Sequence, residues 1–131
     1  MLANGEVRVV SWDELRSEDL GDGRRVVHVR LEDELSGGFE GTASWDDLLF
    51  YRADGSASFV TLGQMRGRLG GREGSFAVAT RGTYDGEWVR SSWTIVADSG
   101  TGALAGIAGT GEMETRPGQA GAYSLEVELP D

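Results

Sequence analysis

The feature that most constrains the fold is a series of glycine-containing turn signals at regular intervals along the chain. The signals are Gly21-Asp22-Gly23, Ser36-Gly37-Gly38, Asp54-Gly55, Gly70-Gly71, Asp85-Gly86, Ser99-Gly100 and Pro117-Gly118. The segments between them are long enough for strands and mostly too short for the helix of a parallel crossover. The spacing therefore predicts a series of antiparallel hairpins.

Between the turns, apolar and polar residues alternate with the period of two that is typical of a half-buried strand. In the segment from Arg25 to Asp33, for example, Val27, Val29 and Leu31 share one face and His28 lies on the other. The pattern predicts strands at residues 5–12, 24–34, 38–45, 48–53 running on after a turn to 57–69, 74–84, 87–97, 106–114 and 122–129.

Two segments predict something other than a strand. Residues 11–20 open with Ser11-Trp12-Asp13-Glu14, which resembles a capping box and favours one helical turn. Residues 101–106 favour a short turn before a glycine-rich strand. Neither segment is long enough to build a helical layer.

Long hairpins without helices bury their apolar faces against each other in a sandwich or a closed barrel. Glycines inside the predicted strands, such as Gly63, Gly67, Gly82 and Gly109, favour the barrel because glycine permits sharp bending. We therefore expect one all-β domain over residues 1–131, a closed antiparallel β-barrel of about eight strands. An interior of this size is filled by side chains or holds one small ligand.

Composition excludes several chemistries. The chain has no cysteine and no lysine, which rules out thiolate and Schiff-base catalysis, and its single histidine, His28, lies on the polar side of its strand. We expect neither a metal nor an organic cofactor. The net charge of −10 argues against nucleic acid and anionic membranes as partners. With no apolar run of about 18 residues and no signal-peptide pattern, the expected compartment is the cytoplasm.

An ordered set of motifs is similar to the bacterial DUF3224 family. The motifs are Ser11-Trp12-Asp13-Glu14, Tyr51-Arg52-Ala53-Asp54-Gly55-Ser56-Ala57-Ser58-Phe59-Val60, Leu69-Gly70-Gly71-Arg72-Glu73-Gly74-Ser75-Phe76 and Ser99-Gly100-Thr101-Gly102-Ala103-Leu104-Ala105-Gly106. The similarity spans nearly the whole chain. It implies an allene oxide cyclase-like, or calycin-like, barrel and leaves the reaction undefined.

The chain departs from the family pattern at two places. Gly63 stands where the family commonly has an acid, and Ala79-Thr80 stands where it commonly has Gln-His. Smaller groups at these positions are expected to widen and dry the interior.

Candidate site residues come from the aromatic and acidic side chains. Trp12, Gly63, Phe76, Thr80 and Trp93 are the substrate-binding candidates, together with Glu112, and Tyr51 and Glu40 are the catalytic candidates. Each has an alternative interpretation. The aromatic residues equally suit core packing. Glu40 donates a proton only if the polar face of its strand points inward, and the outward orientation is favoured; Glu112 is likewise explained as a surface acid.

The leading hypothesis is a cyclase or isomerase of bacterial secondary metabolism that acts on a small, apolar or amphipathic substrate inside the barrel. With so few catalytic groups, we expect the shape of the pocket to dominate the mechanism. The alternative is a non-catalytic barrel that binds a hydrophobic ligand. Moving from the barrel to a cyclase is an analogy of fold.

The sequence also predicts assembly. Tyr123, Leu125, Val127 and Leu129 alternate along the last strand and would offer an apolar face to a second copy. We therefore expect a homodimer or homotrimer, since closed symmetric homo-oligomers are the usual outcome. Light scattering at micromolar concentration measures it, and a mass of only 14.0 kDa would contradict the prediction.

Overall fold

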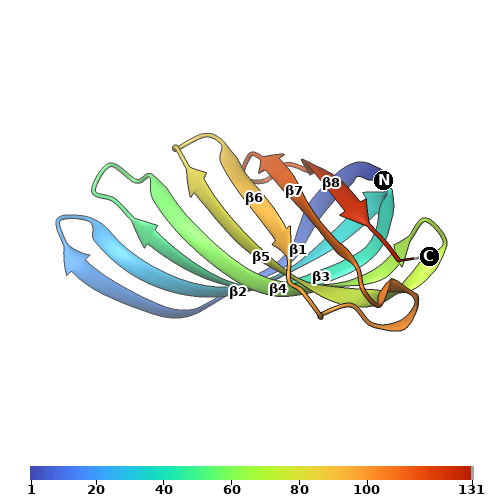
Figure 1. Ribbon diagram of the computed structural model, residues 1–131. Helices are drawn as coiled ribbons and strands as arrows, with labels where there is room; N and C mark the ends of the chain where they lie inside the picture. The colour runs from blue at the N-terminus through green and yellow to red at the C-terminus, as the bar shows by residue number, and fades with distance from the viewer. Residues whose placement is uncertain (131) are drawn as a thin grey trace.

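The computed structural model describes residues 1–130, whose strands form one closed barrel in sequential order (Figure 1). The elements are β1 (Leu2–Gly21), β2 (Arg24–Gly37), β3 (Phe39–Tyr51), β4 (Ala57–Leu69), β5 (Arg72–Tyr84), β6 (Val89–Ile95), a 3-10 helix η1 (Gly102–Leu104), β7 (Ala108–Thr115) and β8 (Gly121–Glu128). The predicted all-β, antiparallel, eight-stranded barrel is confirmed.

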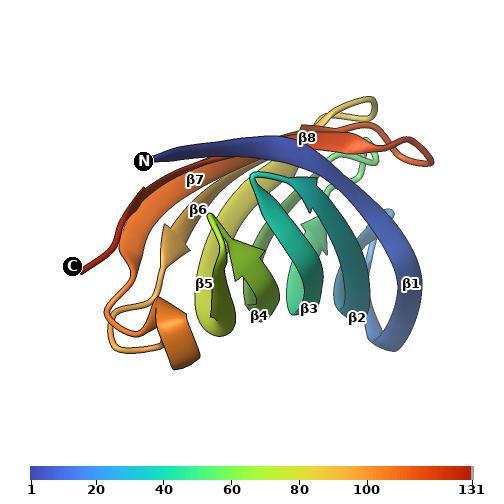
Figure 2. The same ribbon diagram turned by 90° about the vertical axis from the view of Figure 1, so that its right-hand side faces the viewer.

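Every strand pairs antiparallel with the strand that follows it, and β1 returns to pair with β8. This closing ladder is short. It joins Leu2–Val7 of β1 to Gly121–Glu126 of β8, whereas β1 pairs with β2 along nearly its whole length. Figure 2 shows β1 crossing the barrel beside β8 and then curving away from it alongside β2.

The helical turn expected at residues 11–20 is wrong, because β1 continues through them as a strand. The β2 ladder supplies backbone partners along this segment, so tertiary pairing overrides the local capping signal. Register shifts after Val9, Glu14 and Asp19 mark bulges, which bend the strand. Likewise β3 is one strand, where two segments were expected.

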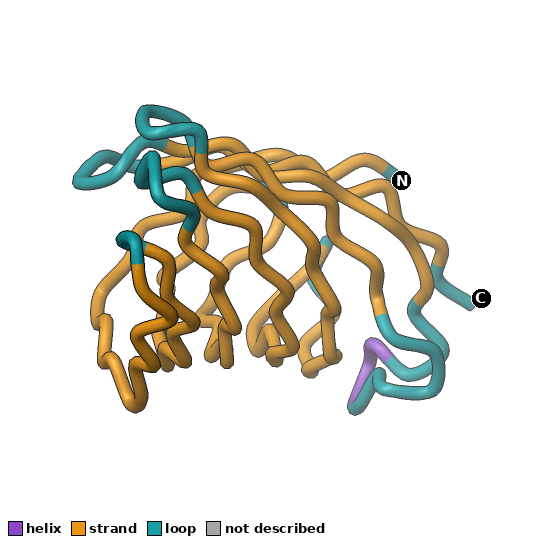
Figure 3. Tube along the Cα trace, turned by 90° about the vertical axis from the view of Figure 1, so that its left-hand side faces the viewer, coloured by secondary structure: helices purple, strands orange, loops and turns teal. Residues whose placement is uncertain are grey.

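One end of the barrel is filled by side chains. Phe39 packs edge-on against Phe76 with ring centroids 5.7 Å apart, and Met65 and Leu69 are fully buried beside them. The β6–β7 connection, which contains η1, passes over this end, and Leu104 of η1 is buried there. Figure 1 shows this connection on the far side of the barrel from the turns β1–β2, β3–β4 and β5–β6, and Figure 3 shows η1 (purple) well away from the loops gathered at the other end.

Two interior glycines lie beneath aromatic rings of the neighbouring strand. A Cβ at Gly82 would lie 2.3 Å from Cζ of Phe59, and one at Gly63 would lie 2.5 Å from Cε3 of Trp45. Any larger residue would displace these rings. The glycines therefore fix where the Phe59 and Trp45 side chains lie inside the barrel.

The apolar side chains of β8 face inward. Tyr123, Leu125 and Val127 are buried in the core, so the surface on which the assembly prediction was based does not exist. The exposed apolar side chains on the outer face of the sheet instead include Leu48, Phe50, Val60 and Leu62 of β3 and β4. A homodimer or homotrimer stays a prediction.

Residues 1–130 contain no helix long and apolar enough to cross a bilayer.

The hydroxyl of Tyr123 ties β8 to the β2–β3 turn. It accepts a hydrogen bond from the Phe39 backbone N–H at 2.9 Å and lies 2.8 Å from the carbonyl oxygen of Ser36. This is a buried bond between residues far apart in sequence. It fixes the end of the barrel that the core fills.

We expect Tyr123→Phe to lower the free energy of unfolding by about 1–3 kcal/mol, because the buried Phe39 N–H loses its acceptor. Urea denaturation measures the change. Tyr84→Phe is the matched control, since its hydroxyl donates an exposed bond to the Gly86 carbonyl. It should cost less than about 0.5 kcal/mol. Equal effects of the two changes would contradict the assigned role of Tyr123.

Candidate functional site

The end of the barrel opposite η1 contains a cavity of about 770 Å³. Its walls come from the inward faces of β1 to β7, and the β7–β8 turn, from Arg116 to Ala120, borders it. The cavity exists because β1 diverges from β8 after Val7, so the strands that close one end of the barrel splay at the other. Its volume lies in the range typical of small-molecule sites.

Aromatic rings make up much of the wall. Trp45 and Trp93 line the cavity with ring centroids 5.5 Å apart, and Trp93 also stacks at 6.2 Å on Tyr123, a core residue outside the lining. The remaining aromatic lining residues are Trp12, Tyr51, Phe59 and Tyr84. Such a surface favours a flat, mainly apolar ligand.

A row of polar side chains crosses the aromatic wall. Asp47 lies opposite Thr61 in the β3–β4 ladder, and Thr61 lies opposite Thr80 in the β4–β5 ladder. Ser91 of β6 adds a hydroxyl that accepts a hydrogen bond from Nε1 of Trp93 at 2.9 Å. All four side chains line the cavity, and their polar groups offer a ligand specific hydrogen bonds.

Asp33 of β2 is the most deeply buried acid of the cavity, with 7% of its surface exposed. Its Oδ2 accepts a hydrogen bond from Nε1 of Trp45 at 2.9 Å. Its Oδ1 is buried and has no hydrogen-bond partner among the described residues. Burial raises the pKa of Asp33 to about 7, although the Trp45 bond opposes the shift.

Asp47 is half-buried on the neighbouring strand, and the two acids repel each other. Burial raises the pKa of Asp47 to about 6, while the side chain of Thr61 opposes the shift. The cavity thus holds two carboxyl groups that titrate near neutral pH. Groups of this kind exchange protons readily with a bound molecule.

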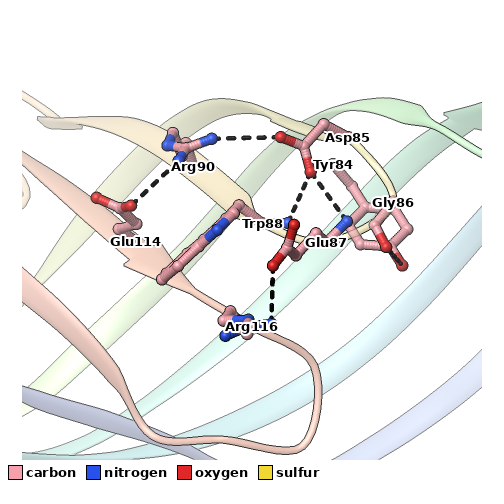
Figure 4. A network of polar contacts seen from close by, with 8 residues as sticks. All are labelled: Tyr84, Asp85, Gly86, Glu87, Trp88, Arg90, Glu114 and Arg116. Atoms are coloured by element: carbon pink, nitrogen blue, oxygen red, sulfur yellow. Dashed lines mark hydrogen bonds and ion pairs between the residues drawn. The ribbon is translucent and has the colours of Figure 1, made fainter.

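Charged residues at the mouth and on the adjoining outer surface are held in ion pairs. Figure 4 shows Arg116 bonded to Glu87 at 2.8 Å and Arg90 between Asp85 and Glu114. Arg116 also lies over the Trp88 ring at 5.1 Å. Hydrogen bonds from the backbone N–H groups of Trp88 and Glu87 lower the pKa of Asp85, which keeps this turn charged and ordered. On the other side of the mouth, Arg8 pairs with Glu34 at 2.6 Å.

Four of the residues selected from the sequence line the cavity: Trp12, Tyr51, Thr80 and Trp93. Trp12 is still 53% exposed because β1 curves away from β8 at this point. Arg25 lies over the Tyr51 ring at 4.6 Å, and burial raises the pKa of the Tyr51 hydroxyl. The structure brings these four residues to one site.

The other four lie elsewhere. Glu40 is exposed on the outer face opposite Arg68, so it cannot reach a molecule inside the barrel. Glu112 is also exposed and lines a separate polar groove on the outer surface. Phe76 belongs to the filled end, and Gly63 lies beneath the Trp45 ring. Ala79 faces outward, whereas Thr80 lines the cavity.

The sequence analysis missed Asp33 and Asp47, although the alternation contained a signal for both. Asp33 continues the inward series of Val27, Val29 and Leu31, and Asp47 lies in phase with Trp45 of β3. An acid in phase with buried apolar residues is expected to be desolvated. No group of three or more histidine or acidic side chains suited to a metal ion occurs within residues 1–130.

The raised pKa of Asp33 makes folding stability depend on pH. Below about pH 4 the folded and unfolded chains both bind its proton, but between pH 4 and 7 only the folded chain keeps it, so stability falls as pH rises. Asp33→Asn removes this loss. Relative to wild type, the variant should gain stability through this window, reaching on the order of 4 kcal/mol above pH 7.

Urea denaturation at several pH values measures this gain. Asp46→Asn is the control, because His28 and Arg30 hold the pKa of that exposed carboxyl below its usual value. That variant should gain nothing as pH rises. A constant difference between Asp33→Asn and wild type across the window would contradict the assigned burial of Asp33.

Comparisons with known proteins agree with the fold and leave the activity open. Residues 3–127 match the family described as "Protein of unknown function (DUF3224)". A crystal structure of a DUF3224 family protein of unknown function from Shewanella oneidensis MR-1 superposes with a TM-score of 0.83 at 25% identity, covering 100% of this chain and 98% of the other. No curated protein matches the chain. The match over nearly the whole length confirms the resemblance seen in the sequence motifs: this chain belongs to the DUF3224 family.

Proposed function

We propose that this barrel is a small-molecule isomerase or cyclase that encloses a mainly apolar substrate and moves protons on it with Asp33 and Asp47. The observation that carries the proposal is the placement of both carboxyls in one aromatic-lined cavity. Isomerisation and many ring closures need a proton donor and a proton acceptor on the same substrate, with no cofactor.

The environments of the two acids support different roles. Asp33 is more deeply buried and its pKa is about 7, whereas that of Asp47 is about 6. Between these values the favoured state has Asp33 protonated and Asp47 ionised. Two carboxyls whose pKa values differ in this way can serve as acid and base in the same step.

The shape of the cavity keeps the part that the sequence suggested for it. Trp45, Trp93 and Tyr51 restrict how a flexible or flat substrate can lie, and orientation alone can lower a barrier by several kcal/mol, up to about 7–11. In this proposal Asp33 and Asp47, which line the cavity, take the place of Glu40 as the acids near the substrate. The mechanism we propose therefore combines shape with acid–base chemistry.

Non-catalytic binding of an apolar ligand is the second candidate. It is favoured by the aromatic and aliphatic side chains, among them Trp93, Phe59 and Leu49, that form most of the cavity wall. A carrier needs this wall but does not need two acids with raised pKa values. The two candidates differ in whether the bound molecule is changed.

Binding is tested first with Prodan, a neutral naphthalene dye whose emission rises and shifts in apolar surroundings. Thr80→Phe fills the cavity from its wall, so it should weaken Prodan binding by at least about tenfold. Thr83→Phe makes the same change on the exposed face of the same strand and should leave binding within about twofold of wild type, as expected of a surface change. Equal effects would place the binding site outside this cavity.

Catalysis is tested by incubating the protein with a small-molecule cell extract and separating the products by chromatography and mass spectrometry. An isomerase or cyclase produces a compound of unchanged mass and new retention time. The Asp33→Asn/Asp47→Asn double variant should not produce it. A molecule retained by the wild-type protein in native mass spectrometry without any new isomer would favour the carrier.

A further inference from the structure

The Asp33 carboxyl offers one free oxygen to the cavity. Its Oδ2 is occupied by the Trp45 indole N–H, whereas Oδ1 is buried and lacks a partner. A buried polar atom without a partner costs about 1–3 kcal/mol, so its retention beside a cavity points to a ligand group that completes it. When Asp33 is protonated with Oδ2 accepting from Trp45, the proton lies on Oδ1 as a donor.

We propose that the substrate is an enolisable ketone with an aromatic or unsaturated body, whose carbonyl oxygen accepts a hydrogen bond from Asp33 while Asp47 moves the proton on the adjacent carbon. This inference rests on the proposed function and names the substrate class of the same site. Asp47 suits the role of base because it lines the same cavity, with Trp45 between it and Asp33 along the β2–β3 ladder.

The titratable groups around the cavity leave Asp33 as the group that meets a negative charge developing on the ligand. The titratable side chains that line it with Asp33 are Arg8 of β1, Asp47 and Tyr51 of β3, Tyr84 of β5 and Arg116 of the β7–β8 turn. Glu14 and Arg25 lie at the rim near Tyr51, and Asp46 and His28 lie behind Asp47. Because Arg8 and Arg116 are paired with Glu34 and Glu87, the hydrogen bond from protonated Asp33 is the interaction that stabilises a developing enolate.

The reaction balances without a further reactant. Asp47 takes the proton from the carbon beside the carbonyl, and the electrons of the broken C–H bond form a C=C bond. The carbonyl π electrons move to oxygen, where Asp33 stabilises the negative charge by donating its hydrogen bond. If the proton on Asp47 exchanges with water before it is returned to the same carbon, the result is hydrogen exchange. If Asp47 delivers the proton to the far end of a conjugated system, the result is an isomer.

Three naphthalene probes of similar size test the hydrogen bond. They are 2-acetylnaphthalene, an acceptor and an enolisable ketone; 2-isopropenylnaphthalene, with a CH₂ group in place of the oxygen; and 1-(2-naphthyl)ethylamine, a cation. Quenching of tryptophan emission at pH 6.5 measures the affinities. The ketone should bind about fivefold tighter than the hydrocarbon, as expected for one net hydrogen bond.

Substitutions at Asp33 separate its donor role from its charge. In Asp33→Asn the amide oxygen can accept the Trp45 bond and the NH₂ group then faces the cavity, so the preference for the ketone should persist. Asp33→Leu removes the donor and should abolish the preference. Circular dichroism checks that each variant is folded. If the Leu variant does not fold, loss of the preference in the folded Asn variant still overturns the donor role of Asp33.

Proton transfer is measured as deuterium uptake into the acetyl group of 2-acetylnaphthalene in heavy water by NMR. Uptake should fall below about pH 6, where Asp47 is protonated, and above about pH 7, where Asp33 is ionised. Asp33→Asn should lose only the upper limb of this profile, because an amide does not titrate. Asp47→Asn should abolish uptake while the ketone keeps its preference in binding.

Equal binding of the ketone and the hydrocarbon, or absence of deuterium uptake, overturns the ketone inference and leaves the proposed cavity site standing. Tighter binding of the amine than of the ketone also overturns it, and identifies a cation as the ligand instead. Failure of all three probes and of Prodan contradicts the proposed function itself. Uptake that survives Asp47→Asn assigns the base elsewhere and overturns the role of Asp47.

Discussion

The short ladder between β1 and β8 is the contact on which the architecture depends. A sheet of antiparallel hairpins becomes a barrel only when its first and last strands pair, and here Leu2–Val7 and Gly121–Glu126 make that junction. The pairing between β1 and β8 stops at Val7, although β1 continues to Gly21. Because β1 bends away at its bulges and follows β2 instead, one end is sealed by core side chains and the other contains a cavity.

The cavity carries its polar groups at an energetic cost. Asp33 is removed from water and Asp47 is half-buried, and within the described residues neither makes an ion pair that would offset the loss of hydration. A core built only for stability would place apolar residues at both positions. Buried acids that titrate near neutral pH are typical of sites where the charge or the proton is used. Asp46, the neighbour of Asp47 on β3, has the opposite environment. Its carboxyl is exposed, and His28 and Arg30 lower its pKa.

The sequence predicted part of the candidate site. Trp12, Tyr51, Thr80 and Trp93 line the cavity as expected. Thr80 faces the interior because it is in phase with the buried residues Phe76 and Val78 of β5. Glu40 and Glu112 were candidates only if the polar faces of their strands pointed inward, but both side chains face water. Whether an acid alternates in step with the buried apolar residues of its strand predicts its position better than the mere presence of an acid. Asp33 and Asp47 are in step with such residues, and Glu40 is not.

The sequence by itself determined the hairpin order and the alternation of faces, because turn signals and the period-two pattern are local properties that each strand carries with it. Only the tertiary structure decided that residues 11–20 extend β1 as a strand, because the partner that satisfies their backbone is β2. It also decided that β8 turns its apolar face to the core and offers none to a second copy. Finally, it brought Asp33 and Asp47 into one cavity. The strand register and the closure of the barrel determine that these two side chains line the same cavity. Both depend on contacts between strands, which no single segment of the sequence encodes.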